Sequence, residues 1–383
     1  MAYSGIIKPS ANFNTLAYTA NGTNPRTITG LGHQPGWLWF KSRESGAIDH
    51  ATWDVVRGVT TGVIHPNTTA MQNTTQDHGK ISAVTSDGFT TIDGPSGSYP
   101  RLWTNDNNAF GTGADDYVVW SWKLGGTPSS NSDGSVTASV SADQAAGVSI
   151  ASFTGTESAI TVGHGLNATP TVWWLKRYTD DGYANTSEWY VKFPKQAAVG
   201  SNKYLTLQSS AVNGSNDGSL WPQDGNTQST NSVVHIGNNA NSNHSGTSVL
   251  LYSFAEKPGF SKFGCYIGNG SNTDGIFNYC GFKPALIIVK RVAGSTDDWR
   301  MVDNKRDISN NHGGGSYRWL YPSANTAEAS DNASGFDLLS NGFKVRSDSA
   351  GVNANGNDYF YMAFAEEPLV SNVGVSGIPA TAK

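Results

Sequence analysis

The feature that most constrains the fold of this chain is an apolar segment that occurs three times. Each occurrence begins with a glycine, contains a proline, and runs through at least four consecutive apolar residues to a lysine six positions after the proline, at Lys41, Lys176 or Lys290. The three segments are GHQPGWLWFKSR (Gly32–Arg43), GLNATPTVWWLKR (Gly165–Arg177) and GFKPALIIVKR (Gly281–Arg291). Repetition on this scale indicates three copies of one structural unit.

Other motifs recur in the same order around these segments. An apolar strand precedes each one, as TLAYTANG, VSIASFTG and FGCYIGNG, and a strongly apolar strand closes each copy, as YVVWSWK, VLLYSFAE and YFYMAFAE. We place boundaries near residues 125 and 258. Copy one is therefore 1–125, copy two is 126–258 with a linker strand at its start, and copy three is 259–383 with a short C-terminal tail.

Composition and periodicity predict an all-β chain. Charged residues make up 14% of the chain, against about 25% in an average soluble domain, and the 44 glycines supply turns. No segment shows a sustained helical period, whereas short apolar strands alternate with Gly/Asn turns. This pattern predicts three tandem antiparallel β-sandwich modules of jelly-roll or lectin-like type.

The repeated segments are apolar on both faces of the predicted strand. In copy one, Trp37 and Trp39 point to one side while Leu38 and Phe40 point to the other. A strand of a simple sandwich needs one apolar face only. We therefore expect the second face to be covered by a long loop, a neighbouring module or another subunit.

Copy one contains LGHQPGWLWFKSR, WDVVRG, SDGF and DYVVWSWKLGG, and copy three contains GFKPALIIVKR, VDNKRD, SNGF and NDYFYMAFAE. This order of motifs, which spans nearly the whole chain, resembles a repeated domain of uncharacterised function found in structural proteins of marine tailed phages, cyanophages among them. The closing SGIPATAK also looks like the short tail of that family. The resemblance implies a virion component, in a tail fibre or other adsorption device or on the head surface, and it brings no catalytic residues.

Charged residues recur at the ends of the repeated strands. An aspartate lies thirteen residues after the lysine in copies one and three, and an arginine follows three residues later, whereas copy two has Trp189 at the aspartate position. Ion pairs that close the strand end explain this spacing, with Asp303 as the partner of Lys290. The alternative is a clamp for an anionic ligand. The residues of these predicted ion pairs are Lys41, Asp54, Arg57, Lys290, Asp303 and Arg306.

Neither a metal nor a cofactor is expected. Asp115 and Asp116 lie in an oxygen-rich loop that could hold calcium, but ordinary Asx turns account for such loops, and the histidines lack the spacing of a zinc site. Hydrolysis of a polysaccharide requires two carboxylates with divided roles. Glu328, Asp331 and Asp337 cluster in the sequence, but a solvated loop accounts for them, so we do not expect an enzyme.

Aromatic residues beside turns are the candidates for contact with a glycan. Aromatic faces stack on sugar rings, and neighbouring Asn, Asp and Gln side chains bond to the hydroxyl groups. The alternative for each residue is packing in a core or against another subunit. The candidates are Trp103, Trp221, Tyr317, Trp319 and Tyr321.

The two cysteines, Cys265 and Cys280, flank a predicted β-hairpin. A cross-strand disulfide is geometrically possible, but two thiols are favoured because the N-terminus lacks the features of a secretory signal. The formal net charge of −5 comes without a basic block, so nucleic acid is not expected as a partner. No apolar run approaches the ~18 residues of a membrane helix, so membrane insertion is not expected.

Together with these observations, the resemblance implies a non-enzymatic virion protein, which we expect to be made in the host cytoplasm and placed on the particle surface. Its expected role is host attachment through surface glycans, in a tail-fibre type of component. Its expected partners are other virion proteins and further copies of itself, with a trimer favoured by analogy to phage fibres. The alternatives are an architectural protein of the head or tail without a ligand, and a polysaccharide depolymerase.

Overall fold

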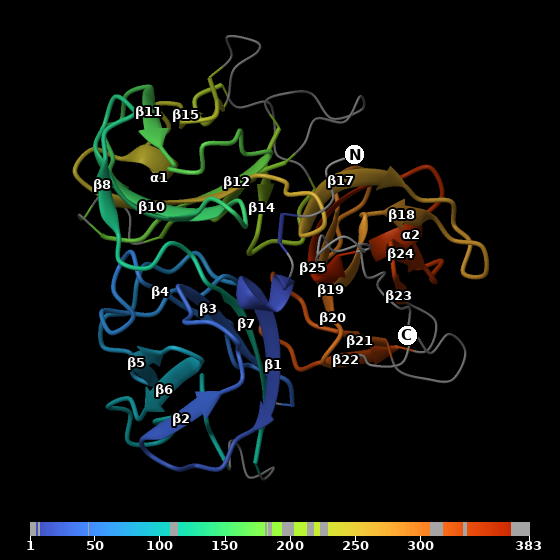
Figure 1. The fold of residues 1–383 in the computed structure, drawn as a ribbon, viewed down its shortest axis with the longest axis horizontal. Helices are drawn as coiled ribbons and strands as arrows, with labels where there is room; N and C mark the ends of the chain where they lie inside the picture. The colour runs from blue at the N-terminus through green and yellow to red at the C-terminus, as the bar shows by residue number, and fades with distance from the viewer. Residues whose placement is uncertain are drawn as a thin grey trace.

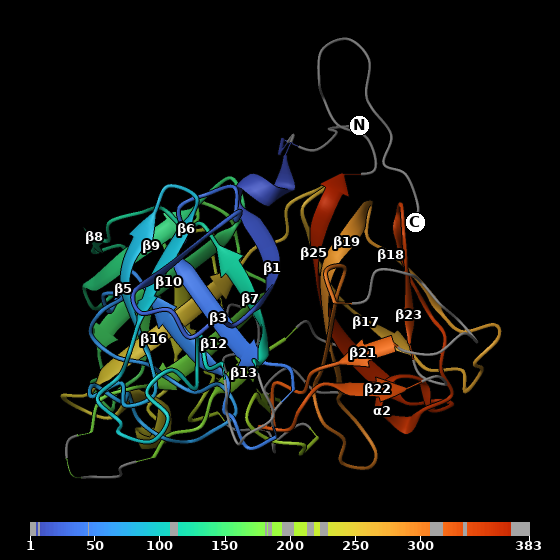
Figure 2. The same cartoon turned by 90° about the horizontal axis from the view of Figure 1, so that it is seen from below.

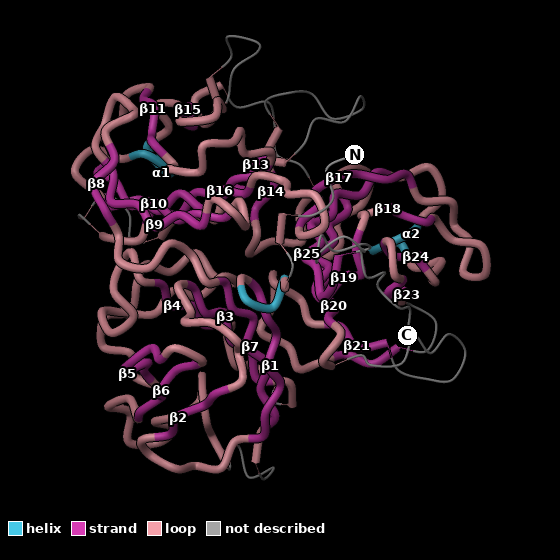
Figure 3. The backbone as a smooth tube through the Cα atoms, in the orientation of Figure 1, coloured by secondary structure: helices cyan, strands magenta, loops and turns pink. Residues whose placement is uncertain are grey.

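The structure is a computed structural model that describes residues 5–6, 8–44, 46–107, 114–180, 182, 186–193, 203–212, 218–222, 229–306, 317–331 and 335–368. Strands account for 43% of the residues and helices for 3%, and the sheets are antiparallel and open, which confirms the all-β class. The strands form three groups that follow the three copies along the chain, as the colours of Figure 1 and the strands of Figure 3 show.

Three sheets, here called the large sheets, have the same strand order. In each, the first strand of the copy pairs with the closing strand, which pairs with the strand of the repeated apolar segment, here called the anchor strand. A fourth strand follows beside the anchor strand. The orders are β1 (Phe13–Thr19), β7 (Asp116–Trp122), β3 (Trp37–Ser42), β4 (Ala51–Asp54) in copy one; β10 (Val148–Thr154), β16 (Ser248–Phe254), β12 (Val172–Arg177), β13 (Tyr190–Lys192) in copy two; and β17 (Ser261–Ile267), β25 (Asp358–Pro368), β19 (Phe282–Arg291), β20 (Arg300–Asp303) in copy three.

The large sheet of copy two is longer than the other two. β14 (Leu205–Thr206) extends it beyond β13, and β9 (Ala138–Asp143) and then β8 (Ser129–Asn131) extend it beyond β10. The linker was expected to contain one strand, and it forms two because residues 129–143 fold back as an antiparallel pair along β10.

Each copy also has a small sheet. The orders are β2 (Arg26–Thr29), β6 (Gly88–Ile92), β5 (Lys80–Thr85) in copy one; β11 (Ile160–Gly163), β15 (Val233–Ile236) in copy two; and β18 (Phe277–Tyr279), β24 (Gly342–Val345), β23 (Phe336–Leu339) in copy three. The remaining elements are the 3-10 turn η1 (Pro9–Ala11), the one-turn helices α1 (Ala240–Asn243) and α2 (Ala350–Asn353), and the strand pair β21 (Tyr317–Trp319), β22 (Ala329–Asp331).

One face of each anchor strand packs on the small sheet of the same copy. In copy one, Leu38 and Phe40 share a buried cluster with Ile28 and Phe89 of the small sheet. The clusters of copies two and three are built in the same way, from Trp173 and Leu175 with Val162 and Val234, and from Ile287 and Val289 with Phe343 and Val345. Each copy therefore has a core of its own.

The opposite faces of the anchor strands meet in one further cluster, here called the shared core. Trp37, Trp39, Trp174, Leu286 and Ile288 all belong to it, so it contains residues of all three copies. The Trp37 ring lies 4.1 Å from the Trp122 ring and 5.9 Å from the Trp174 ring. Of the three covers expected for the second apolar face, the neighbouring copy is the one that provides it. Figure 1 and the turned view in Figure 2 both place the third group of strands beside the first.

Hydrogen bonds from ring nitrogens to backbone carbonyl oxygens connect the three copies in a cycle. In each large sheet, the residue just before the fourth strand has a ring nitrogen within hydrogen-bond distance of a backbone carbonyl oxygen of another copy. Copy one contacts copy three in this way, copy two contacts copy one, and copy three contacts copy two. The contacts are His50 Nε2 to Tyr321 O at 3.0 Å, Trp189 Nε1 to His65 O at 3.2 Å, and Trp299 Nε1 to Thr206 O at 2.9 Å. Because three copies and three contacts close the cycle, no copy occupies an end position.

The histidine in this cycle has a defined tautomer. Trp39 Nε1 donates a hydrogen bond to His50 Nδ1 at 2.9 Å, so the neutral ring carries its proton on Nε2 and donates it to Tyr321 O. Burial holds the pKa of His50 well below its usual range, which keeps the ring neutral. Trp189 was expected to occupy the aspartate position of copy two. The strand register shows instead that it corresponds to His50 and Trp299.

The predicted hairpin between the two cysteines is wrong. Cys265 lies on β17, which pairs with β25, whereas Cys280 directly follows β18, which pairs with β24 in the small sheet. The two cysteines do not form a disulfide, and burial raises the pKa of Cys280 to about 12. Among the residues described, no helix has the length and apolar character needed to cross a membrane.

Candidate functional site

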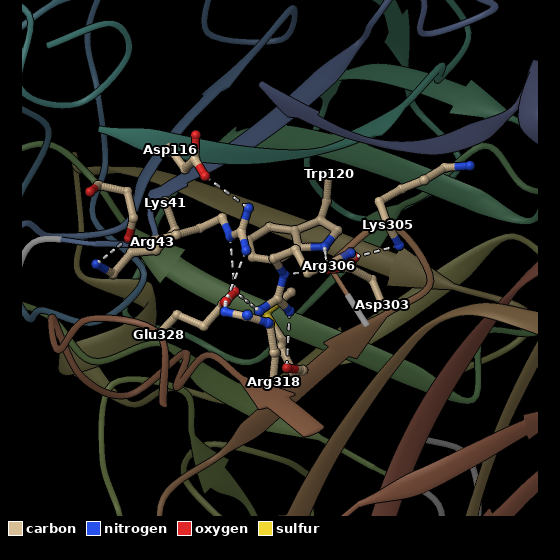
Figure 4. A network of polar contacts seen from close by, with 11 residues as sticks. Lys41, Arg43, Asp116, Trp120, Asp303, Lys305, Arg306, Arg318 and Glu328 are labelled. Carbon is tan, nitrogen blue, oxygen red and sulfur yellow. Dashed lines mark hydrogen bonds and ion pairs between the residues drawn. The ribbon is translucent and has the colours of Figure 1, made fainter. Parts of the chain in front are cut away.

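Of the charged residues singled out in the sequence, Asp303, Arg306 and Glu328 lie in a buried cluster between copies one and three (Figure 4). Asp303 ends β20, and its Oδ1 accepts hydrogen bonds from the backbone N–H groups of Lys305 and Arg306, both at 3.0 Å. Its Oδ2 accepts from Arg306 Nε at 2.7 Å, and neither of these two side chains is exposed. The Asp-x-x-Arg spacing thus produces a turn that is closed by its own ion pair.

Glu328 connects this turn to copy one. Its carboxylate accepts from Arg43 Nε and Nη2, both at 3.0 Å, from Arg306 Nη1 at 2.9 Å, and from Arg318 Nη1 at 2.8 Å. Its backbone N–H donates to Arg43 O at 2.7 Å. Burial raises the pKa of Glu328, but hydrogen bonds and charges of Arg43 and Arg306 outweigh it and lower the pKa to about 2. Three guanidinium groups therefore hold this carboxylate ionised.

Trp120 of the closing strand β7 completes the cluster. Its Nε1 donates to Asp303 Oδ2 at 3.0 Å, and the Arg306 guanidinium lies 5.5 Å from the centre of its ring. Arg43 also lies 3.5 Å from Asp116. Because the buried charges of the described residues are paired and hydrogen-bonded to one another, the cluster joins two copies.

A similar arrangement lies between copy one and copy two. Asp54 Oδ2 accepts from Arg57 Nε at 2.6 Å, and Arg57 Nη1 donates to Gln72 Oε1 at 3.0 Å. The backbone N–H of Gln72 donates to Tyr178 O at 3.0 Å. Gln72 therefore takes the place that Glu328 has in copy three, and Tyr178, two residues after the anchor lysine, takes that of Arg43.

The predicted ion pairs between lysine and aspartate are wrong. Lys290 Nζ donates to the carbonyl oxygens of Ser210, Arg291 and Asp297 at 3.1, 3.0 and 2.8 Å, and Asp303 pairs with Arg306 instead. The reason is geometric, because the Asp-x-x-Arg turn already brings the carboxylate and guanidinium groups together. Backbone carbonyls from the loops around the strand end receive the ammonium group.

The other two anchor lysines behave in the same way. Lys176 Nζ donates to Thr69 O of copy one at 3.2 Å, and Lys41 Nζ donates to Ser42 O at 2.9 Å. Burial lowers the pKa of Lys41 and Lys176 to about 7 and that of Lys290 to about 8. The repeated lysines are thus buried donors to backbone carbonyls, which for Lys176 and Lys290 include loops of a neighbouring copy and for Lys41 is Ser42 of its own strand.

Four of the five aromatic residues proposed for glycan contact are core residues. Trp103 belongs to the core of copy one, Trp221 to that of copy two, and Tyr317 and Trp319 to that of copy three, with exposed fractions of 6%, 0%, 1% and 1%. Tyr321 is half-buried against the core of copy three. The predicted glycan contact is therefore wrong for the four buried residues, because their rings are packed against apolar neighbours, and it stays a prediction for Tyr321. A turn beside an aromatic residue did not reveal on which side of the sheet the ring lies.

The carboxylates considered for metal binding or catalysis are engaged within the fold. Asp115 accepts from Ser42 Oγ at 2.9 Å, and Asp116 accepts from Thr19 Oγ1 at 2.6 Å. In the part of the chain that the structure describes, no group of three His, Cys, Asp or Glu side chains is placed to hold a metal ion.

The prediction that Glu328, Asp331 and Asp337 lie in a solvated loop is wrong for Glu328 and Asp337. Glu328 is buried in the cluster above. Asp337 Oδ2 accepts from Arg346 Nε at 2.6 Å, while its Oδ1 accepts from Tyr317 O–H at 3.3 Å. The side chain of Asp331 lies outside the described residues.

A buried asparagine in each copy was not found from the sequence. Asn105, Asn243 and Asn353 accept a backbone N–H from the loop after the first strand, at 3.2, 3.0 and 3.0 Å, and donate back to carbonyl groups of that loop. The shared signal is Asn-x-x-Gly in copies two and three, at Asn243 and Asn353. These residues hold the turn between the large and small sheets.

Among the described residues, two pockets are considered as candidate binding sites. The larger, of about 850 Å³, lies where copy one meets the linker and has Val55, Val59 and Leu124 among its apolar lining residues. The smaller, of about 400 Å³, lies between copies one and two. Its lining is Thr69, Thr186, Ser187, Glu188, Tyr190, Tyr204, Asn239 and Asn241.

The smaller pocket has the chemistry of a site for neutral polar ligands. Tyr204 is half-buried and supplies the accessible ring, whereas Tyr190 is a core residue, 5% exposed, whose ring lies 5.4 Å away at 73°. The rest of the lining supplies hydroxyl and amide groups that donate and accept hydrogen bonds. Burial raises the pKa of Glu188, the carboxylic acid of this lining. Aromatic rings combined with amide and hydroxyl groups suit the alternating apolar and hydroxyl faces of a sugar.

Comparison with known proteins identifies a family but no function. The model of one family, described as a domain of unknown function (DUF7483), matches residues 8–368. No curated protein and no solved structure gave a match.

Proposed function

This chain belongs to the DUF7483 family, and we propose that it is a non-catalytic structural protein of a tailed-phage virion that attaches to host-surface glycans. It acts on the particle surface as a tail-fibre or other adsorption component and assembles with copies of itself and with other virion proteins. The order of its repeated motifs supports the virion assignment through the resemblance given above. The observation that carries the attachment role is the pocket in which the half-buried ring of Tyr204 lies beside hydroxyl and amide groups.

The architecture fits a rigid carrier of such a site. We propose that each copy is one β-sandwich module of jelly-roll or lectin-like type, formed by its large sheet, its small sheet and the core between them. The shared core and the cycle of cross-copy hydrogen bonds hold the three modules as one body. A pocket between two modules is then fixed in shape before its ligand arrives, which reduces the entropy lost on binding.

The pockets support a role without catalysis. Glycoside hydrolysis uses two carboxyl groups on opposite sides of the scissile bond. Among the described lining residues, the smaller pocket has one acid, Glu188, and the larger has one acid, Asp143. A depolymerase is therefore the less favoured function.

A glycan array probed with the purified full chain tests the attachment role. We expect binding to a subset of neutral glycans, and we expect Tyr204→Ala to weaken that binding at least tenfold, since an aromatic platform in a sugar site contributes more than about 1.4 kcal/mol. Tyr99→Ala is the matched control, because Tyr99 is, like Tyr204, a half-buried tyrosine packed against the core of one copy, and it lies outside this pocket. An array without any bound glycan, or binding that survives Tyr204→Ala unchanged, would remove the attachment role.

Antibody labelling of purified particles tests the virion assignment separately. Gold particles at the tail are the expected result. Labelled particles combined with a negative array would favour the second candidate, an architectural protein of the head or tail, which the exposed apolar residues of copy three support. Particles that carry no label would contradict both.

A further inference from the structure

One of the three hydrogen bonds that connect the copies in a cycle comes from a residue that titrates. His50 donates to Tyr321 O of copy three, whereas tryptophans hold the corresponding positions in the other two copies, at Trp189 and Trp299. An indole N–H remains a donor whatever the pH, whereas an exposed imidazole ring gains a second proton near about pH 6.5. Of these three contacts, the one between copies one and three is therefore the one that acid can change.

The hydrogen bonds of His50 fit the neutral ring and exclude the charged one. Nδ1 accepts from Trp39 Nε1 at 2.9 Å, and Nε2 donates to Tyr321 O at 3.0 Å. A second proton would have to sit on Nδ1, where the Trp39 N–H already points, so two donors would face each other. The protonated ring can therefore not keep both partners, and one of these two bonds has to open.

The surroundings of His50 also oppose a positive charge. The side chain is fully buried. The charged and titratable groups that face it are Lys41 on β3, Arg306 in the turn after β20, and His65 in the loop after β4. Burial lowers the pKa of His50 most, each of these three groups lowers it further, and the hydrogen bond to Tyr321 O opposes them only in part. Geometry and charge thus act in the same direction.

A second histidine continues this contact to copy two. His65 Nδ1 donates to His50 O at 2.7 Å, and His65 O accepts from Trp189 Nε1 at 3.2 Å. His65 is buried as well, and burial lowers its pKa. The groups that face His65 are Asp49, which favours the charged ring, and Lys176 and His78, which oppose it. Two linked histidines therefore lie between the contacts of copy one with both other copies.

We propose that His50 is an acid-sensitive latch that holds the loops of copy three on copy one. Above pH 6.5 the ring is neutral in the closed and the open arrangement, so the latch has its full strength. Below pH 6.5 an exposed ring takes up a proton, whereas the closed arrangement still excludes it. The contact therefore weakens as the pH falls, and its opening equilibrium shifts about tenfold per pH unit. This response to acid goes beyond the proposed function and does not depend on it.

The latch acts on the loops of the interface and leaves the shared core closed. Phe13 and Phe364 hold copies one and three together at 5.3 Å without a titratable group. The loops join through backbone hydrogen bonds, among them the one from Glu328 N–H to Arg43 O at 2.7 Å. Local opening of such loops exposes few residues and needs less free energy than global unfolding. The amide of Glu328 therefore reports on the state of the latch.

Hydrogen exchange of the full chain, read residue by residue and corrected for the intrinsic exchange rate at each pH, tests the latch. From about pH 7.5 to about pH 5 we expect protection of the Glu328 amide to fall about thirtyfold, the change that one exposed histidine produces. This range lies above the window in which the Glu328 carboxylate titrates. Global unfolding would also release the buried rings of His33, His65 and His164 and would give a far steeper decline.

His50→Gln removes the titratable ring. Its side-chain oxygen can accept from Trp39 Nε1 and its amide N–H can donate to Tyr321 O, so we expect protection of the Glu328 amide to become independent of pH across this range. If this variant does not fold, the decline in the unmodified chain decides by itself.

His33→Gln is the matched control. His33 is also a buried histidine of copy one with hydrogen bonds at both ring nitrogens, but its partners, Ser10 and Ser121, belong to copy one itself. This variant is expected to keep the thirtyfold decline at Glu328. Protection that does not change with pH in the unmodified chain overturns the latch, as does the steep decline of global unfolding, or a decline that His50→Gln leaves intact. None of these outcomes decides the glycan array or the particle labelling.

Discussion

The carboxylate of Glu328 joins more charged groups than any other single residue of the cluster between copies one and three. Its side chain is 5% exposed and receives hydrogen bonds from Arg43, Arg306 and Arg318. Copy one has Gln72 in the equivalent place, where the single guanidinium of Arg57 needs only a neutral acceptor. The negative charge at position 328 therefore balances the additional arginines that meet there.

This arrangement makes the free energy of unfolding depend on pH in the acidic range. The pKa of Glu328 is lowered from 4.5 to about 2 in the folded chain, so its contribution is fully present above pH 4.5 and is lost as the pH falls toward 2. A shift of this size corresponds to on the order of 3 kcal/mol of unfolding free energy. We expect the free energy of unfolding, measured with urea, to decline as the pH falls through this window. The decline is expected to be smaller in Glu328→Gln, which installs the residue type that copy one has in the equivalent place.

Asp274→Asn is the matched control for this prediction. Asp274 also pairs with a cation, Lys344, but its side chain is 92% exposed, and exposed pairs contribute little. Its pH profile is expected to follow that of the unmodified chain. A Glu328→Gln variant with the same acid dependence as the unmodified chain would contradict the assignment.

The sequence predicted some of these residues and not others, for a physical reason. The spacing of Asp303 and Arg306 was visible because both lie in one turn. Glu328 was assigned to a solvated loop, since its partner Arg43 lies 285 residues away in the chain and no local pattern records such a distance. The same limit explains the aromatic candidates, because proximity to a turn does not tell whether Trp221 faces solvent or a core.

Among the elements, the anchor strands were the most informative part of the sequence. Apolar residues on both faces required two covers, and the structure supplies the small sheet of the same copy on one side and neighbouring copies on the other. The identity of the second cover could not be predicted, because a loop, a module and a subunit all satisfy the same pattern. The linker was likewise predicted to be a strand, but its return as β8 and β9 depends on the open edge of β10.

The cross-copy hydrogen bonds at the start of the fourth strands can be tested individually. Trp299→Phe removes the donor to Thr206 O while keeping an aromatic side chain, and it leaves a buried carbonyl without this donor. We expect a loss of about 1 to 2 kcal/mol of unfolding free energy from the missing hydrogen bond, measured by urea titration relative to a matched variant.

Trp174→Phe provides that comparison. Trp174 is a buried tryptophan of the same shared core, but within the described residues its Nε1 has no hydrogen-bond acceptor. Both substitutions remove the same atoms from the interior, so their difference reports the hydrogen bond. Equal losses for the two variants would show that the contact between copies two and three contributes nothing measurable.

At the scale of the whole molecule, three similar copies do not form three independent bodies. The shared core takes apolar residues from each large sheet, and rings from copies one and three lie in contact, as Phe13 and Phe364 do at 5.3 Å. Separation of the copies would expose this core in all of them at once. The cycle of contacts from His50, Trp189 and Trp299 reinforces the same coupling.

We therefore expect the chain to unfold in one cooperative transition, although its length and its three repeats suggest two or three domains. Scanning calorimetry tests this, since the calorimetric and van't Hoff enthalpies agree when all copies unfold together. Residues 1–258 alone should be less stable and bind a hydrophobic dye, because removal of copy three uncovers Phe13 and Trp122, which lie against Phe364 in the full chain. Resolved transitions for single copies, or a truncated chain as stable as the whole, would contradict a shared core.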